Sequence, residues 1–234
     1  MILLILALHL IVFLILILFG RWFGEKGIQI MTKMCSSVSI ILTWSLYISS
    51  SNAEYIYQID PVNWVESDEV LISWGLLLNK STLTMMLLIV TVAPLVNIYS
   101  INYMKGDPHL VRFISYLNLF TFFMLILVTS TNLLQLFVGW EGVGICSYLL
   151  VSFWYTREKA VRSAFKAMAV NKVGDMAFLM AMGILFFSLK TINIINISNI
   201  ALSTGQTEKD INVFICVHSS LWCKCVSVHS FFMI

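Results

Sequence analysis

The stretch LQLFVGWEGVGICSYLL, residues 134–150, decides how the rest of the chain is interpreted. It is almost wholly apolar, yet it carries Glu141 near its middle. A membrane-spanning helix needs about 20 mainly apolar residues, and an ionised carboxylate inside a bilayer costs several kcal/mol. Glycines at 139, 142 and 144 clear space in which another backbone or water can approach the carboxylate. We favour a proton or ion site here over a structural carboxylate satisfied by one neighbouring helix.

The composition places the whole chain in a membrane. Of its 234 residues, 59% are apolar and 11% are charged, whereas a soluble domain is about half apolar and about a quarter charged. The sequence predicts an all-α, polytopic transmembrane helix bundle with six or seven spans, near residues 2–20, 30–50, 81–104, 112–131, 133–154, 163–189 and 211–234. The first apolar run has no basic n-region, which favours a span over a signal peptide. A net charge of +2 gives no indication of nucleic-acid binding.

Four regions follow from this pattern. Residues 1–50 are expected to form N-terminal transmembrane helices, and residues 80–190 a transmembrane core. Between them, residues 51–79 form a polar loop, in which the alternation NAEYIYQI indicates extended structure. Residues 191–234 are expected to form a loop and a last span with an atypical tail.

The basic residues predict an orientation. Lysines and arginines concentrate in alternate loops, which the positive-inside rule assigns to the cytoplasm or, in an organelle, the matrix. These are Arg21, Lys26, Lys33, Lys105, Arg112, Arg157, Lys159 and Arg162. The opposite side carries three lysines (Lys80, Lys190 and Lys209) and most of the acidic residues of segment 51–79, so that segment is expected on the outer side.

Further ionisable residues fall inside the predicted spans. Lys166, Lys172 and Asp175 lie progressively deeper in span 163–189. Because Lys172 and Asp175 are three residues apart, they are helical neighbours, and they can act as a structural ion pair or as part of a relay with Glu141. Lys224 adds a basic group in the last apolar stretch.

The cysteines do not predict a metal centre. There are five, at positions 35, 146, 216, 223 and 225, mostly within apolar runs where small hydrophobic side chains pack. The pair at 223 and 225 lacks a second pair of ligands at zinc spacing. No dinucleotide-binding glycine motif or iron–sulfur cysteine cluster is present either. We therefore expect no cofactor and no metal in this chain.

Three stretches carry a family resemblance: YSINYMKGDPHLVRF (99–113), the run 115–157 that contains GWEGVG and ends in FWYTR, and KAMAVNKVGD (166–175). On these residues the chain resembles NADH–ubiquinone oxidoreductase chain 5, the antiporter-like membrane subunit of respiratory complex I. The resemblance covers 74–186, and it implies the N-terminal part of a longer subunit. It also implies proton translocation, driven by NADH oxidation and quinone reduction elsewhere in the assembly.

The resemblance also implies roles for single residues. Glu141 matches the family's fifth-span glutamate, which pairs with a seventh-span lysine, and Lys224 stands about where that lysine belongs. Asp175 matches the acidic residue of the sixth span, and Lys172 falls where the family usually has arginine. The proton relay is thus expected to comprise Glu141, Lys224, Asp175, Lys172 and Lys166.

The resemblance also bears on partners and location. It implies the other membrane-arm subunits of complex I and lipid as partners, and the mitochondrial inner membrane as the location. The missing C-terminal helices could come from another chain. A subunit of a multi-subunit sodium/proton antiporter is the alternative, and a purely structural piece of a membrane arm is a third. After Asp210 the family pattern breaks, which suggests a change of reading frame.

Overall fold

The computed structural model describes residues 1–50, 57–67 and 70–204. The elements follow in the order α1 (Ile2–Ser50), β1 (Tyr57–Ser67), β2 (Val70–Leu78), α2 (Lys80–Tyr103), α3 (Leu110–Thr129), α4 (Leu133–Val151), α5 (Glu158–Leu189) and α6 (Ile194–Thr204). They divide into two compact units. The first comprises Met1–Gln58 and Leu76–Thr129, and the second comprises Ile59–Gly75 and Ser130–Ile234.

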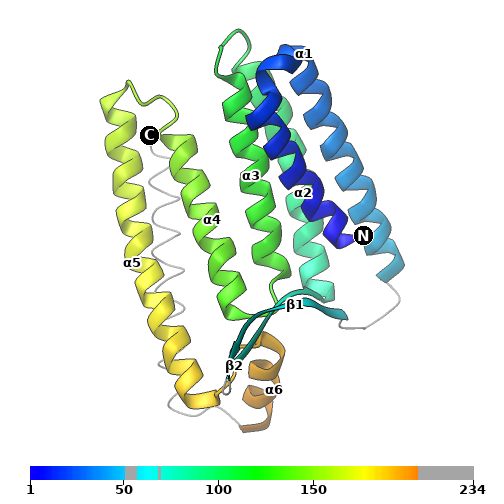
Figure 1. Cartoon of the computed structure of the whole chain (residues 1–234), viewed down its shortest axis with the longest axis vertical. Coiled ribbons are helices and arrows are strands. Elements are labelled where there is room, and N and C mark those ends of the chain that lie inside the picture. Colours follow the sequence, from blue (N-terminus) through cyan, green and yellow to red (C-terminus); the bar gives the residue numbers. More distant parts are fainter. Residues whose placement is uncertain (51–56, 68–69, 205–234) are drawn as a thin grey trace. The chain divides into compact units, whose positions relative to one another are not determined.

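The first unit is built on a sharp reversal within α1. At Gly24 the backbone takes φ 63° and ψ 174°, so two helical halves run in opposite directions (Figure 1). A positive φ is a conformation that glycine adopts without the steric penalty of a side chain. Close packing requires a second glycine, because a Cβ on Gly20 would collide with the side chain of Val111 on α3. Helix α1 packs against both α3 and α2 in this unit.

The core of the first unit mixes apolar side chains with small polar ones. Ile5, Leu16, Met86, Ile114 and Leu125 are fully buried. Hydroxyl residues at 32, 36, 39 and 43 form a buried stripe along the second half of α1, since spacings of three and four place them on one helical face. Small polar residues at such a seam let helices approach closely in lipid.

Helix α2 begins at a side-chain cap. Asn79 accepts a hydrogen bond from Lys80 N (2.7 Å) through its side chain, and its own N–H donates to Thr82 Oγ1 (2.7 Å). Together with a bond from the Asn79 side chain to the backbone of Thr82, this makes a capping box. The stretch NKS therefore begins a helix at this point.

The second unit joins a strand pair to α4, α5 and α6. Strands β1 and β2 form a two-stranded sheet, which confirms extended structure from Tyr57 onward, although residues 51–56 of the expected loop lie outside the described residues. Gln135 of α4 binds β2 as another strand would, accepting from Gly75 N (3.1 Å) and donating to Gly75 O (2.8 Å). Asn132 donates to Ser73 O (2.6 Å) and bridges to Asn193 before α6. These bonds anchor the first turn of α4.

The described spans agree with the predicted bundle. Five helices are long and apolar enough to cross a membrane: Ile2–Gly20, Lys80–Tyr103, Leu110–Thr129, Leu133–Val151 and Glu158–Leu189. Predicted span 30–50 is helical as the second half of α1, but it is not among these five. Predicted span 211–234 lies outside the described residues. The division into regions 1–50, 51–79, 80–190 and 191–234 stays a prediction.

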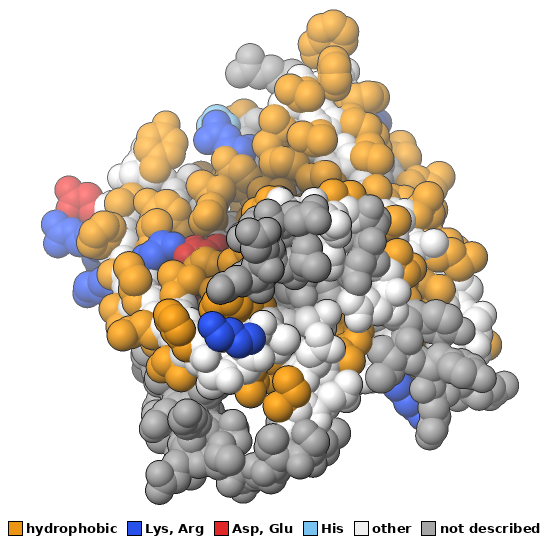
Figure 2. All heavy atoms as spheres, turned by 60° about the horizontal axis from the view of Figure 1, so that its bottom comes forward, with side chains coloured by type: hydrophobic (Ala, Val, Ile, Leu, Met, Phe, Trp, Pro, Cys, Tyr) orange, Lys and Arg blue, Asp and Glu red, His pale blue; other side chains and the backbone are white. Residues whose placement is uncertain are grey.

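Exposed apolar side chains suit a lipid or protein environment. Figure 2 shows hydrophobic side chains over most of the coloured surface, with few charged groups between them. On α5 the most exposed apolar side chains are those of Phe165, Val173, Met176, Met180 and Phe187. Such a surface is unfavourable in water and favourable against lipid tails or neighbouring helices.

Candidate functional site

The candidate site lies between α4 and α5 of the second unit. Glu141 stands in the middle of α4, and Lys172 and Asp175 stand in the middle of α5, all within segments apolar and long enough to span a membrane. Gly139 and Gly142, on either side of Glu141, are buried, and Gly174 is buried beside Asp175. Small residues at these places allow two helices to approach closely, which brings their charged side chains together.

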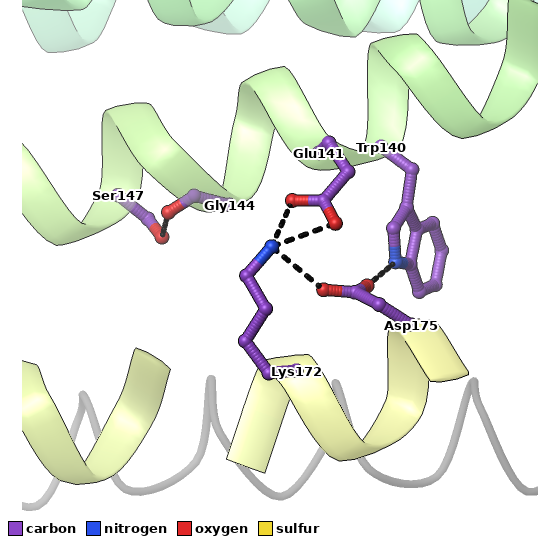
Figure 3. A network of polar contacts seen from close by, with 6 residues as sticks. All are labelled: Trp140, Glu141, Gly144, Ser147, Lys172 and Asp175. Carbon is purple, nitrogen blue, oxygen red and sulfur yellow. Dashed lines mark hydrogen bonds and ion pairs between the residues drawn. The ribbon is translucent and has the colours of Figure 1, made fainter. Parts of the chain in front are cut away.

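Lys172 and Glu141 form a two-point ion pair across the two helices. Lys172 Nζ lies 2.7 Å from Glu141 Oε1 and 2.6 Å from Oε2 (Figure 3). The Glu141 side chain is 23% exposed and that of Lys172 is 47% exposed within this chain. Charge-assisted hydrogen bonds of this length are about twice as strong as neutral ones. The pair is the physical compensation for placing Glu141 in an apolar helix.

Asp175 completes a group of two carboxylates and one ammonium. Its Oδ2 lies 3.5 Å from Lys172 Nζ, and its Oδ1 accepts a hydrogen bond of 2.9 Å from Trp140 Nε1. The Asp175 side chain is only 6% exposed, which makes it the most buried of the three charges. The ammonium of Lys172 therefore lies close to two carboxylates, those of Glu141 and Asp175.

The structure brings three of the five predicted relay residues together and leaves Lys166 apart from them. It brings Glu141, Lys172 and Asp175 into contact, and it confirms the expected neighbour contact between Lys172 and Asp175. Lys166 is exposed on α5 and, among the described residues, makes no ion pair. Lys224 lies outside the described residues, as do Cys216, Cys223 and Cys225. The other two cysteines, Cys35 and Cys146, are buried free thiols, as expected of apolar fillers.

Sequence reasoning missed one residue of this group and one buried histidine of the first unit. Trp140 was not singled out, although a tryptophan inside a buried helix needs an acceptor for its indole N–H, and this requirement could have linked it to Asp175. His9 was missed as well. In the first unit its Nδ1 lies 3.3 Å from Thr121 Oγ1 and 3.8 Å from Cys35 Sγ, and it is 2% exposed. Among the described residues, no group of three or more His, Cys, Asp or Glu side chains is arranged to hold a metal ion.

Comparison with known families decides the relationship. Residues 64–114 match the family described as NADH-ubiquinone oxidoreductase (complex I), chain 5 N-terminus. Residues 130–229 match the transmembrane family of NADH:quinone oxidoreductase and Mrp antiporter. NADH-ubiquinone oxidoreductase chain 5 of Metridium senile is 51% identical over 168 residues, and that of Chondrus crispus is 45% identical over 174 residues. The chain belongs to the NADH–ubiquinone oxidoreductase chain 5 family.

The chain covers part of its relatives' length. The two alignments include 70% and 74% of this chain, but 28% and 26% of the Metridium and Chondrus proteins. The family match to 229 runs beyond Asp210, into the tail where the chain 5 pattern was expected to break. The whole relatives' activity is therefore considered below as a proposal for this chain.

Solved structures support the same fold. A chain of the Mrp complex from Dietzia sp. matches 95% of this chain and 23% of its own length, with a TM-score of 0.76 and 19% identity. A chain of respiratory complex I from Thermus thermophilus matches 92% of this chain and 42% of its own length, with a TM-score of 0.70 and 18% identity. At this identity the comparisons show the fold alone, which the chain shares with these two membrane-complex chains.

Proposed function

We propose that this chain is a proton-translocating membrane-arm subunit of respiratory complex I, located in the mitochondrial inner membrane. In this proposal NADH oxidation and quinone reduction take place in other subunits, and this chain carries no cofactor of its own. The names of the relatives support the assembly, and their eukaryotic sources support the organelle. The other membrane-arm subunits and lipid are the proposed partners.

The observation that carries the proposal is that two carboxylates share the ammonium of Lys172. Lys172 lies 2.6–2.7 Å from the oxygens of Glu141 and 3.5 Å from Asp175. A proton that arrives on Glu141 neutralises this carboxylate and weakens its hold on the ammonium. Lys172 keeps its protons and moves toward Asp175, which remains ionised. Because protonation and ion pairing compete at Glu141, a change in a neighbouring charge can load or release the proton.

Two further lysines are proposed at the ends of this relay. Lys166 lies six residues before Lys172 on α5, which is about 9 Å along a helix axis. It is exposed, so it can exchange protons with water or with a partner subunit. Lys224 is proposed as a second basic partner of Glu141 on the resemblance alone, since it lies outside the described residues.

Glu141→Gln tests the proposal. Glutamine keeps the volume and the hydrogen bonding of the glutamate but cannot be ionised, so protons moved per NADH oxidised should fall by about tenfold or more. Glu158→Gln is the matched control, because Glu158 is 84% exposed and, among the described residues, its ion pair is with Arg162 of its own helix, which is 78% exposed. The measurement is proton uptake by sealed inner-membrane vesicles during NADH oxidation. Equal losses in both variants, or none in Glu141→Gln, would sink the proposal.

A sodium/proton antiporter subunit is the second candidate function. The family matched at residues 130–229 includes the Mrp antiporter, and a Dietzia Mrp chain shares the fold. Relatives named chain 5, at 45% and 51% identity, favour complex I. Transport that requires sodium and continues without NADH would favour the antiporter.

A further inference from the structure

The indole of Trp140 occupies a fixed position beside the charged group. It directly precedes Glu141 on α4, and its Nε1 donates to Asp175 Oδ1 over 2.9 Å. The ring stacks on Phe178 of α5 with centroids 6.2 Å apart and planes 15° from parallel. Phe178 in turn stacks on Phe137 with centroids 5.9 Å apart. Aromatic packing therefore fixes the ring, and the ring fixes where its N–H points.

The two oxygens of Asp175 have different partners. Oδ1 accepts from Trp140, whereas Oδ2 faces Lys172 across 3.5 Å (Figure 3). The ammonium is already closer to both oxygens of Glu141. A carboxylate that is 6% exposed needs further compensation to stay ionised. The N–H of Trp140 supplies part of it.

We propose that Trp140 is a positioning residue of the proton relay, which holds Asp175 ionised and keeps its second oxygen aimed at Lys172. This inference rests on the proposed function. The ammonium must close the gap from 3.5 Å to about 2.8 Å to form a full ion pair with Asp175. A movement of less than about 1 Å thus switches Lys172 between two carboxylates. Trp140 holds the second carboxylate, that of Asp175, ionised and oriented toward the ammonium.

One proton is taken up by Glu141 in one direction of the switch and released by it in the other. When Glu141 is ionised, Lys172 pairs with it at close range, and Trp140 keeps its hydrogen bond to Asp175. When Glu141 takes up a proton on one oxygen, Lys172 transfers its contact to Asp175 Oδ2 and remains a full ammonium. Loss of the same proton from Glu141 restores the first pairing. If Asp175 were itself protonated, it would no longer attract Lys172, and the switch would stay on Glu141.

Trp140→Phe is the test, because phenylalanine keeps an aromatic ring against Phe178 and removes only the N–H donor. A hydrogen bond to a charged group is worth enough to shift the protonation balance of Asp175 by about tenfold or more. We therefore expect infrared difference spectra of the intact complex to gain a carboxylic acid C=O band. Proton translocation per NADH should fall by about fivefold or more, in keeping with a lost acid–base step.

Two controls separate positioning from packing. Trp154→Phe removes an indole N–H from the turn after α4, where the ring contacts Phe153 and Arg157, and should leave both measurements unchanged. In Trp140→Phe combined with Asp175→Asn, the new band should disappear and the loss of pumping should equal that of Asp175→Asn alone, since both act through one residue. Fully additive losses would overturn the inference.

A second replacement covers the case in which Trp140→Phe fails to assemble. Benzothienylalanine at position 140 keeps the bicyclic ring and exchanges the N–H for sulfur, and it should give the same band and the same loss. Wild-type pumping without a new band in either variant overturns the inference. Glu141→Gln separates the proposed function from the positioning role of Trp140. If Glu141→Gln abolishes pumping while both Trp140 replacements behave as wild type, the proposed function stands and the positioning role falls.

Discussion

The two compact units treat their buried polar side chains in opposite ways. In the first unit, the hydroxyls of Thr32, Ser36, Ser39 and Thr43 donate to carbonyls three or four residues earlier in their own helix, over 2.7–2.9 Å. In the second unit, the side chains of Glu141, Lys172 and Asp175 bind across two helices. A hydroxyl can be satisfied locally, whereas a charge in lipid needs a partner on another element.

This difference teaches which polar residues in a membrane helix point to function. The hydroxyl stripe lowers the bulk of a helix face and leaves no unmet bonding requirement, so it serves packing. The charged group has a desolvation cost that packing alone does not offset. Because two of its carboxylates share Lys172, protonation of one changes the pairing of the other. His9 is the intermediate case, since it is buried in the first unit and contacts two other segments.

Lys172→Met should have the largest effect, because it leaves Glu141 and the buried Asp175 without their shared cation. Removing one partner of a buried ion pair costs about 3–5 kcal/mol, and the partial exposure of Lys172 places this change toward the lower end. We expect nearly complete loss of proton translocation, with reduced assembly. The measurement combines proton uptake by inner-membrane vesicles with the amount of assembled complex on native gels.

Lys159→Met provides the comparison, since Lys159 is exposed in the first turn of α5 and, among the described residues, makes no ion pair. It should leave both quantities near wild type. Should Lys172→Met pump normally, the charged group would be a packing feature like the hydroxyl stripe, and the comparison between the units would fail.

Much of the bundle was predictable because membrane helices obey one strong rule. Lipid offers no hydrogen bonds, so apolar runs of sufficient length must be helices, and segments 81–104, 112–131, 133–154 and 163–189 were predicted to within a few residues of four observed helices. The pairing of β1 with β2 was not predicted. In the stretch WGLLL, before Asn79, the alternation of polar and apolar residues gives way to a continuous apolar run. The strand is held by hydrogen bonds between the Gln135 side chain and the backbone of Gly75, which residue patterns do not encode.

The charged group was predictable only in part. Spacing along one helix foretold the contact of Lys172 with Asp175, since residues three apart are neighbours. The closest pair, Lys172 with Glu141, joins different helices, and the sequence left several lysines as candidates. The bond from Trp140 to Asp175 depends on the relative rotation of α4 and α5. A linear pattern constrains the face of one helix but not the angle between two.

His9→Leu should have a smaller effect of a different kind. Leucine fills a similar volume and removes a ring nitrogen that lies 3.3 Å from Thr121 Oγ1. Thr121 keeps its own donor bond to Asn118 O (2.8 Å), so the loss should be near one ordinary hydrogen bond, about 1 kcal/mol. We expect slightly earlier thermal unfolding of the detergent-solubilised complex and proton translocation within about twofold of wild type, since no charge of the relay is touched. Strongly reduced pumping at normal complex content would instead assign a proton site to the first unit.

Ser39→Ala should have the smallest effect. Its size measures whether hydrogen bonds within one helix meet the needs of the buried hydroxyls. Ser39 is fully buried, yet its Oγ donates to the carbonyl of Ser36 in the same helix over 2.9 Å. Alanine removes both the donor and the need for an acceptor, and it is the better helix former. The lost hydrogen bond and the gain in helix propensity nearly cancel. Thermal unfolding of the solubilised complex should therefore show a change in the free energy of unfolding of no more than about 0.5 kcal/mol. A loss above about 1.5 kcal/mol would mean that the hydroxyl also supports contacts between helices. In that case the buried hydroxyls of the first unit, like the side chains of the charged group, would bind residues of another helix.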